Sequence, residues 1–297
     1  MNQVATLSLP PHSFLTDAVV ANVSAEGVCT FGDLKLDAAA AKCIADRNAL
    51  VVKQSSDLPD AVASAVFIPV FVEQCITSLV MLMSRDQMPA DSVVPEPVGV
   101  FEVWEPVGPY EEVALSGGYY GKMERFENVS SFVRFERGTG LPGQVWEKLT
   151  AVIHDDLGNH PGFLRAAGAS ADLLQTAVGI PVVDQDFVSS VVLISSHRSP
   201  IFRGVEVWQA ASDGFDLLGG AYADFPDSMR LNPPVRIATD EGWPKLLSDA
   251  KAAVSSLDAG VIYPGRDVGA SEGLPDSAIA IPRFDGQALH SFIVLMF

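Results

Sequence analysis

One pattern of apolar and polar positions occurs three times along the chain. Each copy has an Ile-Pro pair within an apolar run, and a second apolar run begins with serine nine residues after the proline. The pairs are Ile68-Pro69, Ile180-Pro181 and Ile281-Pro282. Short runs rich in β-branched residues predict paired strands. The copies are one domain length apart, so each is expected to close a separate sheet. Three chance hairpins with the same internal spacing are the weaker alternative.

The segments before the first and third hairpins follow a common plan. A helix is expected over residues 37–44, capped by Asp37, and a strand over residues 50–52. Near the other end, an apolar stripe predicts a helix over residues 246–257, and a strand is expected over residues 261–263.

The stretch from residue 135 to 195 carries the most distinctive pattern. Gly138, Gly140 and Gly143, together with Pro142, precede Trp146, which is typical of a tight turn that leads into a helix. Gly140 and Gly143 are expected to have backbone angles that other residues avoid. The turn lacks the Lys and Ser/Thr of a phosphate-binding loop, so a structural role is favoured.

Residues 98–222 resemble a GAF domain, in which a Gly-Leu-Pro-Gly-x-x-Trp turn precedes a helix and a closing strand pair. The matching segments are 140–146, 180–182 and 190–195. The resemblance implies an α+β fold: an antiparallel sheet with helices on both sides and a small-molecule pocket between sheet and cover. The terminal units lack the Gly-Leu-Pro-Gly turn and look like truncated relatives. We therefore expect a tandem arrangement of units over residues 1–90, 91–224 and 225–297.

A candidate ligand site follows from this resemblance, because aromatic walls with a few convergent polar groups suit a small molecule. Arg165 would offer donors to a polar or anionic ligand. The alternatives are that the aromatic residues belong to the core and that His154 is a surface loop histidine. The candidate wall residues are Trp104, Leu115, Tyr119, Tyr120, His154, Asp155, Phe163 and Arg165.

Composition narrows the function classes. Acidic residues outnumber basic ones 37 to 19, which gives a net charge of −18 and argues against nucleic-acid binding. No apolar run has the length of a membrane span, and residues 1–6 lack the basic start of a secretory signal, so a cytoplasmic protein without membrane contact is expected. The three cysteines, Cys29, Cys43 and Cys75, are too dispersed for a disulfide framework or a zinc site.

The sequence favours a non-enzymatic sensory or regulatory module that binds a small molecule and signals by protein association. No hydrolase or metalloprotease motif is present, and the five histidines are scattered. Two alternatives stay open: a scaffold whose pocket is filled by its own side chains, and a thiol-dependent reductase of free methionine sulfoxide, which GAF-like enzymes exemplify. The sequence identifies neither a cofactor nor the ligand.

The last pattern concerns residues 204–218. Val205, Trp208, Ala211, Phe215 and Leu218 are spaced by three and four positions, which predicts a helix that closes the central unit. Its large apolar residues favour a homodimer formed through this helix, with a signalling protein as another partner. The alternative is that the stripe packs on the chain's own sheets.

Overall fold

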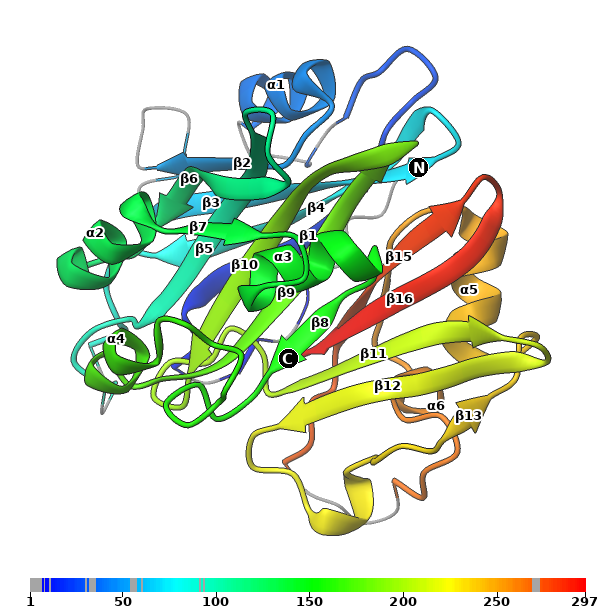
Figure 1. The fold of residues 1–297 in the computed structure, drawn as a ribbon. Coiled ribbons are helices and arrows are strands. Elements are labelled where there is room, and N and C mark those ends of the chain that lie inside the picture. Colours follow the sequence, from blue (N-terminus) through cyan, green and yellow to red (C-terminus); the bar gives the residue numbers. More distant parts are fainter. Residues whose placement is uncertain are drawn as a thin grey trace.

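The computed structural model shows three antiparallel sheets with short helices (Figure 1). It describes residues 7, 9–10, 12–29, 31, 36–53, 58–59, 61–90, 92, 94–268 and 273–297. Residues 1–6, on which the argument against a signal peptide depends, lie outside the described part. The predicted class, α+β with antiparallel sheets in tandem, is confirmed. Within the described ranges, no helix is long and apolar enough to cross a membrane.

The first sheet has four strands in the order β1-β4-β3-β2. The predicted helix is α1 (Asp37–Asp46), and it lies against β2 and β3. Asp37 is its first residue and makes no capping hydrogen bond, and Arg47 ends it in the left-handed conformation. The strands are β1 (Leu15–Asn22), β2 (Leu50–Lys53), β3 (Val62–Val72) and β4 (Cys75–Arg85).

The second sheet has six strands in the order β7-β6-β5-β10-β9-β8. Its helices are α2 (Glu124–Phe132), α3 (Gly140–Lys148) and α4 (Ala166–Ala171). The strands are β5 (Gly99–Val107), β6 (Glu112–Tyr119), β7 (Arg134–Glu136), β8 (Val152–His154), β9 (Leu174–Asp184) and β10 (Asp186–Ser196).

The third sheet repeats this order of six strands, as β13-β12-β11-β16-β15-β14. Its short helices are the 3-10 turn η1 (Asp227–Met229), α5 (Gly242–Ala250) and α6 (Ala259–Ile262). The strands are β11 (Gly204–Ala211), β12 (Gly214–Tyr222), β13 (Arg236–Ile237), β14 (Val254–Ser256), β15 (Ala278–Asp285) and β16 (Ala288–Met296).

The predicted helix over residues 204–218 is wrong, because this segment is the hairpin of β11 and β12. The chain turns at Ser212 and Asp213, and Gly214, paired with Ala211, begins β12; this Ser-Asp-Gly run is a turn signal that the three- and four-residue spacing obscured. Both strands belong to the third sheet, so the third unit starts before the expected boundary at residue 225 and is not truncated in its strands.

The other helix of the third unit is also shorter than predicted. α5 ends at Ala250, followed by Lys251 in the left-handed conformation, and the residues from 254 form the edge strand β14. The strand expected over residues 261–263 is wrong, since residues 259–262 form α6. Apolar side chains from α5, from β14 and from the residues beside that strand happen to continue one stripe across the end of the helix.

The three Ile-Pro segments form hairpins, as predicted. The proline of each pairs with a residue of the following strand: Pro69 with Leu79, Pro181 with Ser190 and Pro282 with Phe292. The equal sequence spacing does not give equal register, because the turn of the middle hairpin is one residue shorter. One residue separates the paired Asp184 and Asp186, whereas two separate the closing pair in each of the other hairpins, which have a bulge at the same place as the middle one.

Each face of the central sheet has a different cover. Val100 and Trp104 pack with residues of α2, α3 and neighbouring loops, whereas Phe101 and Val103 point the other way. The second face joins a core that contains residues of all three sheets. The helices that the GAF resemblance implies on this face are thus replaced by the neighbouring sheets.

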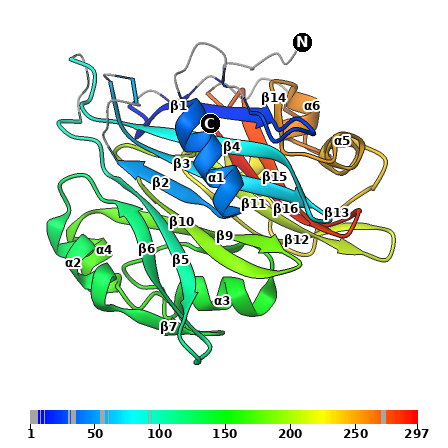
Figure 2. The same cartoon turned by 90° about the horizontal axis from the view of Figure 1, so that it is seen from above.

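The units contact one another in a closed cycle. Strand β2 packs against β5 and β6, β8 against β12, and β14 against β1, while β3 contacts both β9 and β15. Figure 2 shows the three sheets together, with the first in blue to cyan, the second in teal to green and the third in yellow to red. Head-to-tail contacts form a closed ring when the rotation between successive units adds up to a full turn. Here three units of one chain complete the ring.

Candidate functional site

A buried ion pair lies under the helical cover of the central sheet. The side chains of Glu102, on β5, and Arg165, immediately before α4, are 0% and 2% exposed. Arg165 Nη2 donates to Glu102 Oε2 at 2.9 Å, and Nη1 donates to Oε1 of the same carboxylate. Arg165 Nη1 also donates to Ser130 Oγ at 2.6 Å, which ties the residue to α2. This two-pronged geometry is the strongest form of such a pair.

The carboxylate of Glu102 accepts two further hydrogen bonds from the central unit itself. Trp104 Nε1 and the Tyr120 hydroxyl each donate to it at 2.9 Å. Burial, followed by the negative charge of Glu102, raises the pKa of Tyr120, so this hydroxyl keeps its proton. With four donors from the chain, the carboxylate has no acceptor position left for a substrate.

Aromatic rings enclose the guanidinium of Arg165. Its central carbon lies 4.8 Å from the ring centre of Phe126, 5.3 Å from those of Trp104 and Phe163, and 5.9 Å from that of Phe135. Such contacts stabilise a cation that has lost its water. The arrangement resembles a cage for a cationic ligand in which the chain's own arginine takes the ligand's place.

A glycine two residues before Tyr120 makes room for its ring. Side chains at positions i and i+2 share a face of a strand, and a Cβ added at Gly118 would lie 2.7 Å from the tyrosine ring. Glycine therefore allows the ring to fold back along β6 and the hydroxyl to reach Glu102.

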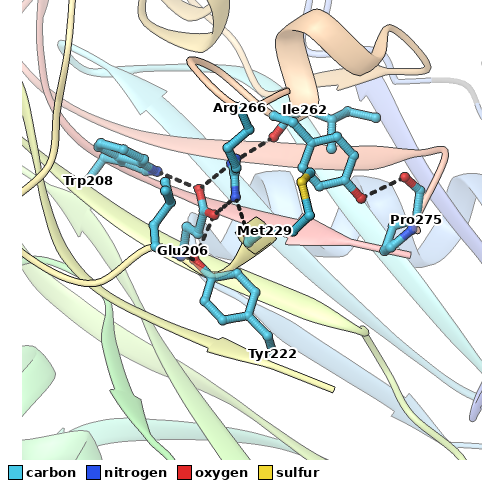
Figure 3. A network of polar contacts seen from close by, with 9 residues as sticks. Glu206, Trp208, Tyr222, Met229, Ile262, Arg266 and Pro275 are labelled. Carbon is cyan, nitrogen blue, oxygen red and sulfur yellow. Dashed lines mark hydrogen bonds and ion pairs between the residues drawn. The ribbon is translucent and has the colours of Figure 1, made fainter. Parts of the chain in front are cut away.

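The third unit contains a second copy of this network, shown in Figure 3. Arg266 Nη1 donates to Glu206 Oε1 at 2.6 Å, and the two side chains are 3% and 1% exposed. Trp208 Nε1 and the Tyr222 hydroxyl donate to the same carboxylate at 3.2 and 2.8 Å. A Cβ at Gly220 would lie 2.6 Å from the Tyr222 hydroxyl oxygen, so the glycine serves the same purpose here.

The guanidinium of the third unit also binds main-chain oxygens. Arg266 donates to the carbonyls of Met229 and Ile262 at 3.2 and 3.3 Å, and it lies 5.0 Å from the ring centre of Tyr263. The guanidinium of Arg266 is thus surrounded mainly by main-chain carbonyls, whereas that of Arg165 is surrounded by Ser130 and aromatic rings.

Strand register shows that the two glutamates are equivalent. Glu102 pairs with Val192 and Glu206 with Val294, in each case two residues beyond the partner of the hairpin proline. The same position in the first unit is Val19, which pairs with Met81. The first unit therefore has no such pair.

Four of the predicted site residues meet at the central network: Trp104, Tyr120, Phe163 and Arg165. His154 lies beside them, with its ring centre 6.3 Å from that of Phe163 and 3.9 Å from that of His160. His154 is 1% exposed, so the surface-histidine alternative is wrong, and Leu115 packs at the margin of the same apolar cluster.

Tyr119 and Asp155 lie apart from the network. Tyr119 lines a separate cavity of about 680 Å³ between the first and central units, together with Lys53 and Lys122. Asp155 accepts a hydrogen bond from the Thr176 hydroxyl at 2.6 Å. Of the predicted residues, these two do not contribute to one site with the others.

The two glutamates and the whole second network were not predicted from the sequence. A usable signal was present, because Glu-Val-Trp occurs at 102–104 and again at 206–208, each time followed by Gly-Gly-x-Tyr, at 117–120 and 219–222. Neither motif has a known chemistry by itself, so only their joint repetition could have indicated a common structural role.

The glycine-rich turn lies at the start of α3 and away from the ion pair. Gly140 has a φ of +61°, as predicted, and Gly242 at the start of α5 has +51°. Gly143 has ordinary helical geometry instead, but a Cβ there would lie 2.0 Å from the carbonyl oxygen of Glu136. Its glycine is required by close packing.

The cysteines do not have the properties of a reactive thiol pair. Burial, followed by the charge of Asp37, raises the pKa of Cys29 to about 11. Burial, followed by the charges of Cys29 and Asp46, raises that of Cys43 to about 12. The Cys43 thiol donates to the Asn48 carbonyl at 3.0 Å, whereas Cys75 is exposed. Thiolate chemistry needs the opposite shift.

Comparison with known proteins gives similarity at the level of structure only. No protein-family model and no curated protein sequence matches the chain. Among solved structures, it is similar to a free methionine-R-sulfoxide reductase from Neisseria meningitidis in complex with its substrate, with 16% identity and a TM-score of 0.27. The match covers 34% of this chain and 53% of the reductase.

Two further structures are similar over about the same share of the chain. The Nlh2 GAF domain of A. aeolicus in an inactive state has 15% identity and a TM-score of 0.28, with 34% of this chain and 59% of that chain covered. The GAF domain/HD domain protein from Geobacter sulfurreducens has 14% identity and a TM-score of 0.29, with 35% and 66% covered. The chain thus spans little more than half the length of the first two structures.

Proposed function

We propose that this protein is a non-enzymatic regulatory scaffold that acts by associating with another protein, and that the interior sites of its two complete units are closed by the chain itself. The observation that supports this is the duplicated network, in which an arginine of the chain occupies the place of a ligand in both units. Of the alternatives open at the sequence level, this is the scaffold with self-filled pockets.

In a buried ion pair of this kind, hydrogen bonds from the surrounding side chains replace the water that the two charged groups have lost. Removing charged groups from water costs several kcal/mol for each ion, and this cost is repaid only where hydrogen bonds satisfy the remaining lone pairs and protons. Both carboxylates are satisfied in this way by tryptophan, tyrosine and arginine. An incoming metabolite would have to replace all of these contacts at once.

Native mass spectrometry of the protein purified without added ligand tests the proposal. We expect the mass of the chain alone, 31.6 kDa per protomer. A constant additional mass that disappears in a folded Glu102→Leu/Arg165→Met variant would overturn it, because the central site would then hold a ligand. The double substitution keeps approximate volume and leaves no unpaired charge behind.

A small-molecule sensor is the second candidate, supported by the cavity that Tyr119 lines. Its volume of about 680 Å³ is within the usual range for ligand pockets. Lys122, at its edge, pairs with Glu96 at 2.5 Å, and Lys53 pairs with Glu127 at 3.0 Å. A bound mass in the same experiment that is lost in Tyr119→Ala, and kept in the Glu102→Leu/Arg165→Met variant, would favour this candidate.

A further inference from the structure

The turns of the β3–β4, β9–β10 and β15–β16 hairpins lie at the same end of the molecule (Figure 1). Between them is a cavity of about 230 Å³ whose walls come from all three units. Phe71 belongs to the first unit, Val183 to the central unit, and Arg283 with Phe284 to the third. The cavity is therefore complete only when the three units are assembled.

Arg283 occupies a position at which the other two units have a buried valine. It follows the hairpin proline, and its counterparts Val70 and Val182 are 2% and 1% exposed. Each of these three residues pairs with a serine of the following strand, namely Ser78, Ser189 and Ser291. The fold accepts an apolar side chain at this position, so the charge of Arg283 is not needed to build the ring.

The half-buried guanidinium of Arg283 lacks a partner. In the part of the chain that the structure describes, its Nε atom is buried without a hydrogen bond, and its terminal nitrogens form neither a hydrogen bond nor an ion pair. Burial, which outweighs the attraction of nearby Asp285, lowers the pKa of Arg283. A charge removed from water without a partner is costly, and a bound anion would supply the missing acceptors.

The other walls of the cavity select the kind of anion. Phe71, Val183 and Phe284 are apolar, whereas Glu73 and Asp285, which also line the cavity, are exposed carboxylates. A single guanidinium matches the two oxygens of a carboxylate, and the apolar walls suit an apolar body attached to it. The two acidic side chains and the net charge of −18 repel multiply charged anions such as phosphate.

Contacts between the hairpins hold the cavity in place. Glu73 N donates to Gly286 O at 3.2 Å, and Gln287 Nε2 donates to Glu73 Oε1 at 3.0 Å, which joins the first and third units. Arg47 Nε donates to Asp184 Oδ2 at 2.7 Å, which joins the first and central units. A preformed site of this kind loses little free energy to ordering when a ligand binds.

We propose that this cavity binds a small monocarboxylate with an apolar body, whose carboxylate pairs with Arg283. The site is separate from the two interior networks, so the inference goes beyond the proposed function. Exposed residues line the cavity, and the ligand exchanges with solvent, so protein purified without it still has the mass of the chain alone. Because the ligand contacts all three units, its binding stabilises the assembled ring.

Benzoate is the probe, because it joins a carboxylate to an apolar ring. Benzamide keeps the ring without the charge, and inorganic phosphate keeps the charge without the ring. A short peptide that ends in phenylalanine, with a free or an amidated C-terminus, distinguishes a protein C-terminus from a free metabolite as the source of the carboxylate. Titration calorimetry measures the affinity, and NMR of the Arg283 Nε–H group in the full chain shows whether the ligand meets the guanidinium.

We expect benzoate to shift the Arg283 Nε–H signal saturably, and benzamide and phosphate to bind at least about tenfold more weakly. Arg283→Val, which copies the other two units, should weaken benzoate at least about tenfold without lowering the melting temperature. Val183→Phe fills the cavity, leaves Arg283 in place and should weaken benzoate as much. Arg137→Ala is the control, because it removes one exposed positive charge outside the cavity and should leave the affinity unchanged.

An affinity for benzoate that is unchanged in folded Arg283→Val or Val183→Phe would overturn the proposal, as would an Arg283 signal that benzoate does not move. Tighter binding of phosphate than of benzoate would overturn the choice of a monocarboxylate. Tighter binding of the free-acid peptide, lost on amidation, would support the site and make a protein C-terminus the source. The interior networks are tested by mass spectrometry with other variants, so either proposal can fail alone.

Discussion

At the scale of single residues, burial decides the role of Arg165. The sequence suggested an arginine that offers donors to a ligand, but the guanidinium lies in a cage of aromatic rings and bonds to Glu102. We expect Arg165→Ala to lower the free energy of unfolding by about 3–5 kcal/mol, because an unpaired carboxylate would stay buried. Denaturant unfolding measures this.

Two matched variants make the Arg165 measurement specific. Arg137→Ala breaks an exposed pair with Glu111 at 3.0 Å and should cost less than about 1 kcal/mol. Glu102→Leu/Arg165→Met removes both charges and should cost much less than Arg165→Ala. A loss in Arg165→Ala no larger than that in Arg137→Ala would contradict the structural role and return Arg165 to the candidate ligand contacts.

His154 provides a residue-scale test with pH. Burial, followed by the charges of His160 and Lys148, lowers its pKa from 6.5 to about 4, and Gln144 Oε1 lies 3.2 Å from its Nε2. The unfolded chain therefore binds the proton more tightly. The contribution of neutral His154 to the free energy of unfolding is complete above pH 6.5. It is lost as the pH falls toward 4, which lowers the unfolding free energy by about 1–3 kcal/mol.

The measurement for His154 is the change in unfolding free energy between pH 7 and pH 4.5. Burial also lowers the pKa of His290, so part of the slope has the same sign and another origin. The expected result is a shallower slope in His154→Gln than in the unchanged protein. Identical slopes would show that His154 is protonated equally well in both states.

At the scale of elements, the start of α3 should require glycine at position 140, because the backbone there has a positive φ. It begins α3 with a φ of +61°, and a Cβ there would lie 2.4 Å from the Phe135 ring. We expect Gly140→Val to lower the unfolding free energy by about 1–3 kcal/mol in denaturant titrations. Gly219→Ala is the control, because its Cβ would meet no atom within 4 Å and its φ is not positive. An unchanged midpoint for Gly140→Val would refute the strain argument.

The elements also show what the sequence could and could not predict. The Ile-Pro hairpins were predictable because their β-branched runs are short and bounded by polar residues. The 204–218 hairpin was not recognised, because a strand pair around a two-residue turn placed apolar residues at helical spacing by coincidence. Some residues of the network, such as Trp104 and Tyr120, were predicted because they are aromatic. Glu102 and Glu206 were not, because nothing in the sequence next to them indicates that these charged side chains are buried.

The absence of the helix predicted over residues 204–218 removes the basis for a dimer formed through it. Trp208 is 0% exposed on β11 and packs on Phe292, with ring centres 6.3 Å apart. Trp208 therefore lies in the core of the third unit and presents no surface to a second copy. The homodimer stays a prediction, which sedimentation equilibrium can test. The helix on which it was based is not present, because residues 204–218 form a hairpin.

At the scale of the whole molecule, three sheets share one core. Residues such as Phe67, Ile180 and Leu295 belong to one continuous apolar cluster. Polar contacts also join the units: Asn48 Nδ2 donates to Glu105 Oε1 at 2.7 Å, and Ala253 N donates to Ser78 Oγ at 2.9 Å. One face of each sheet is buried in this shared cluster, so a separated unit would lose that part of its core, although the central unit has a second cluster of its own under α2 and α3.

This shared core predicts that the three units unfold together, although a chain of 297 residues would ordinarily divide into separately melting domains. Leu295, on β16, is 0% exposed, and Leu295→Ala should cost about 2–5 kcal/mol. If the ring is one cooperative unit, this third-unit change lowers the melting temperature of the central and first units by the same amount. Calorimetry should show one transition whose calorimetric and van't Hoff enthalpies agree, and amides of β3 and β10 should lose protection in parallel with those of β16. A second transition that Leu295→Ala leaves in place would mean that the units are stable separately and that the sheet contacts only join finished domains.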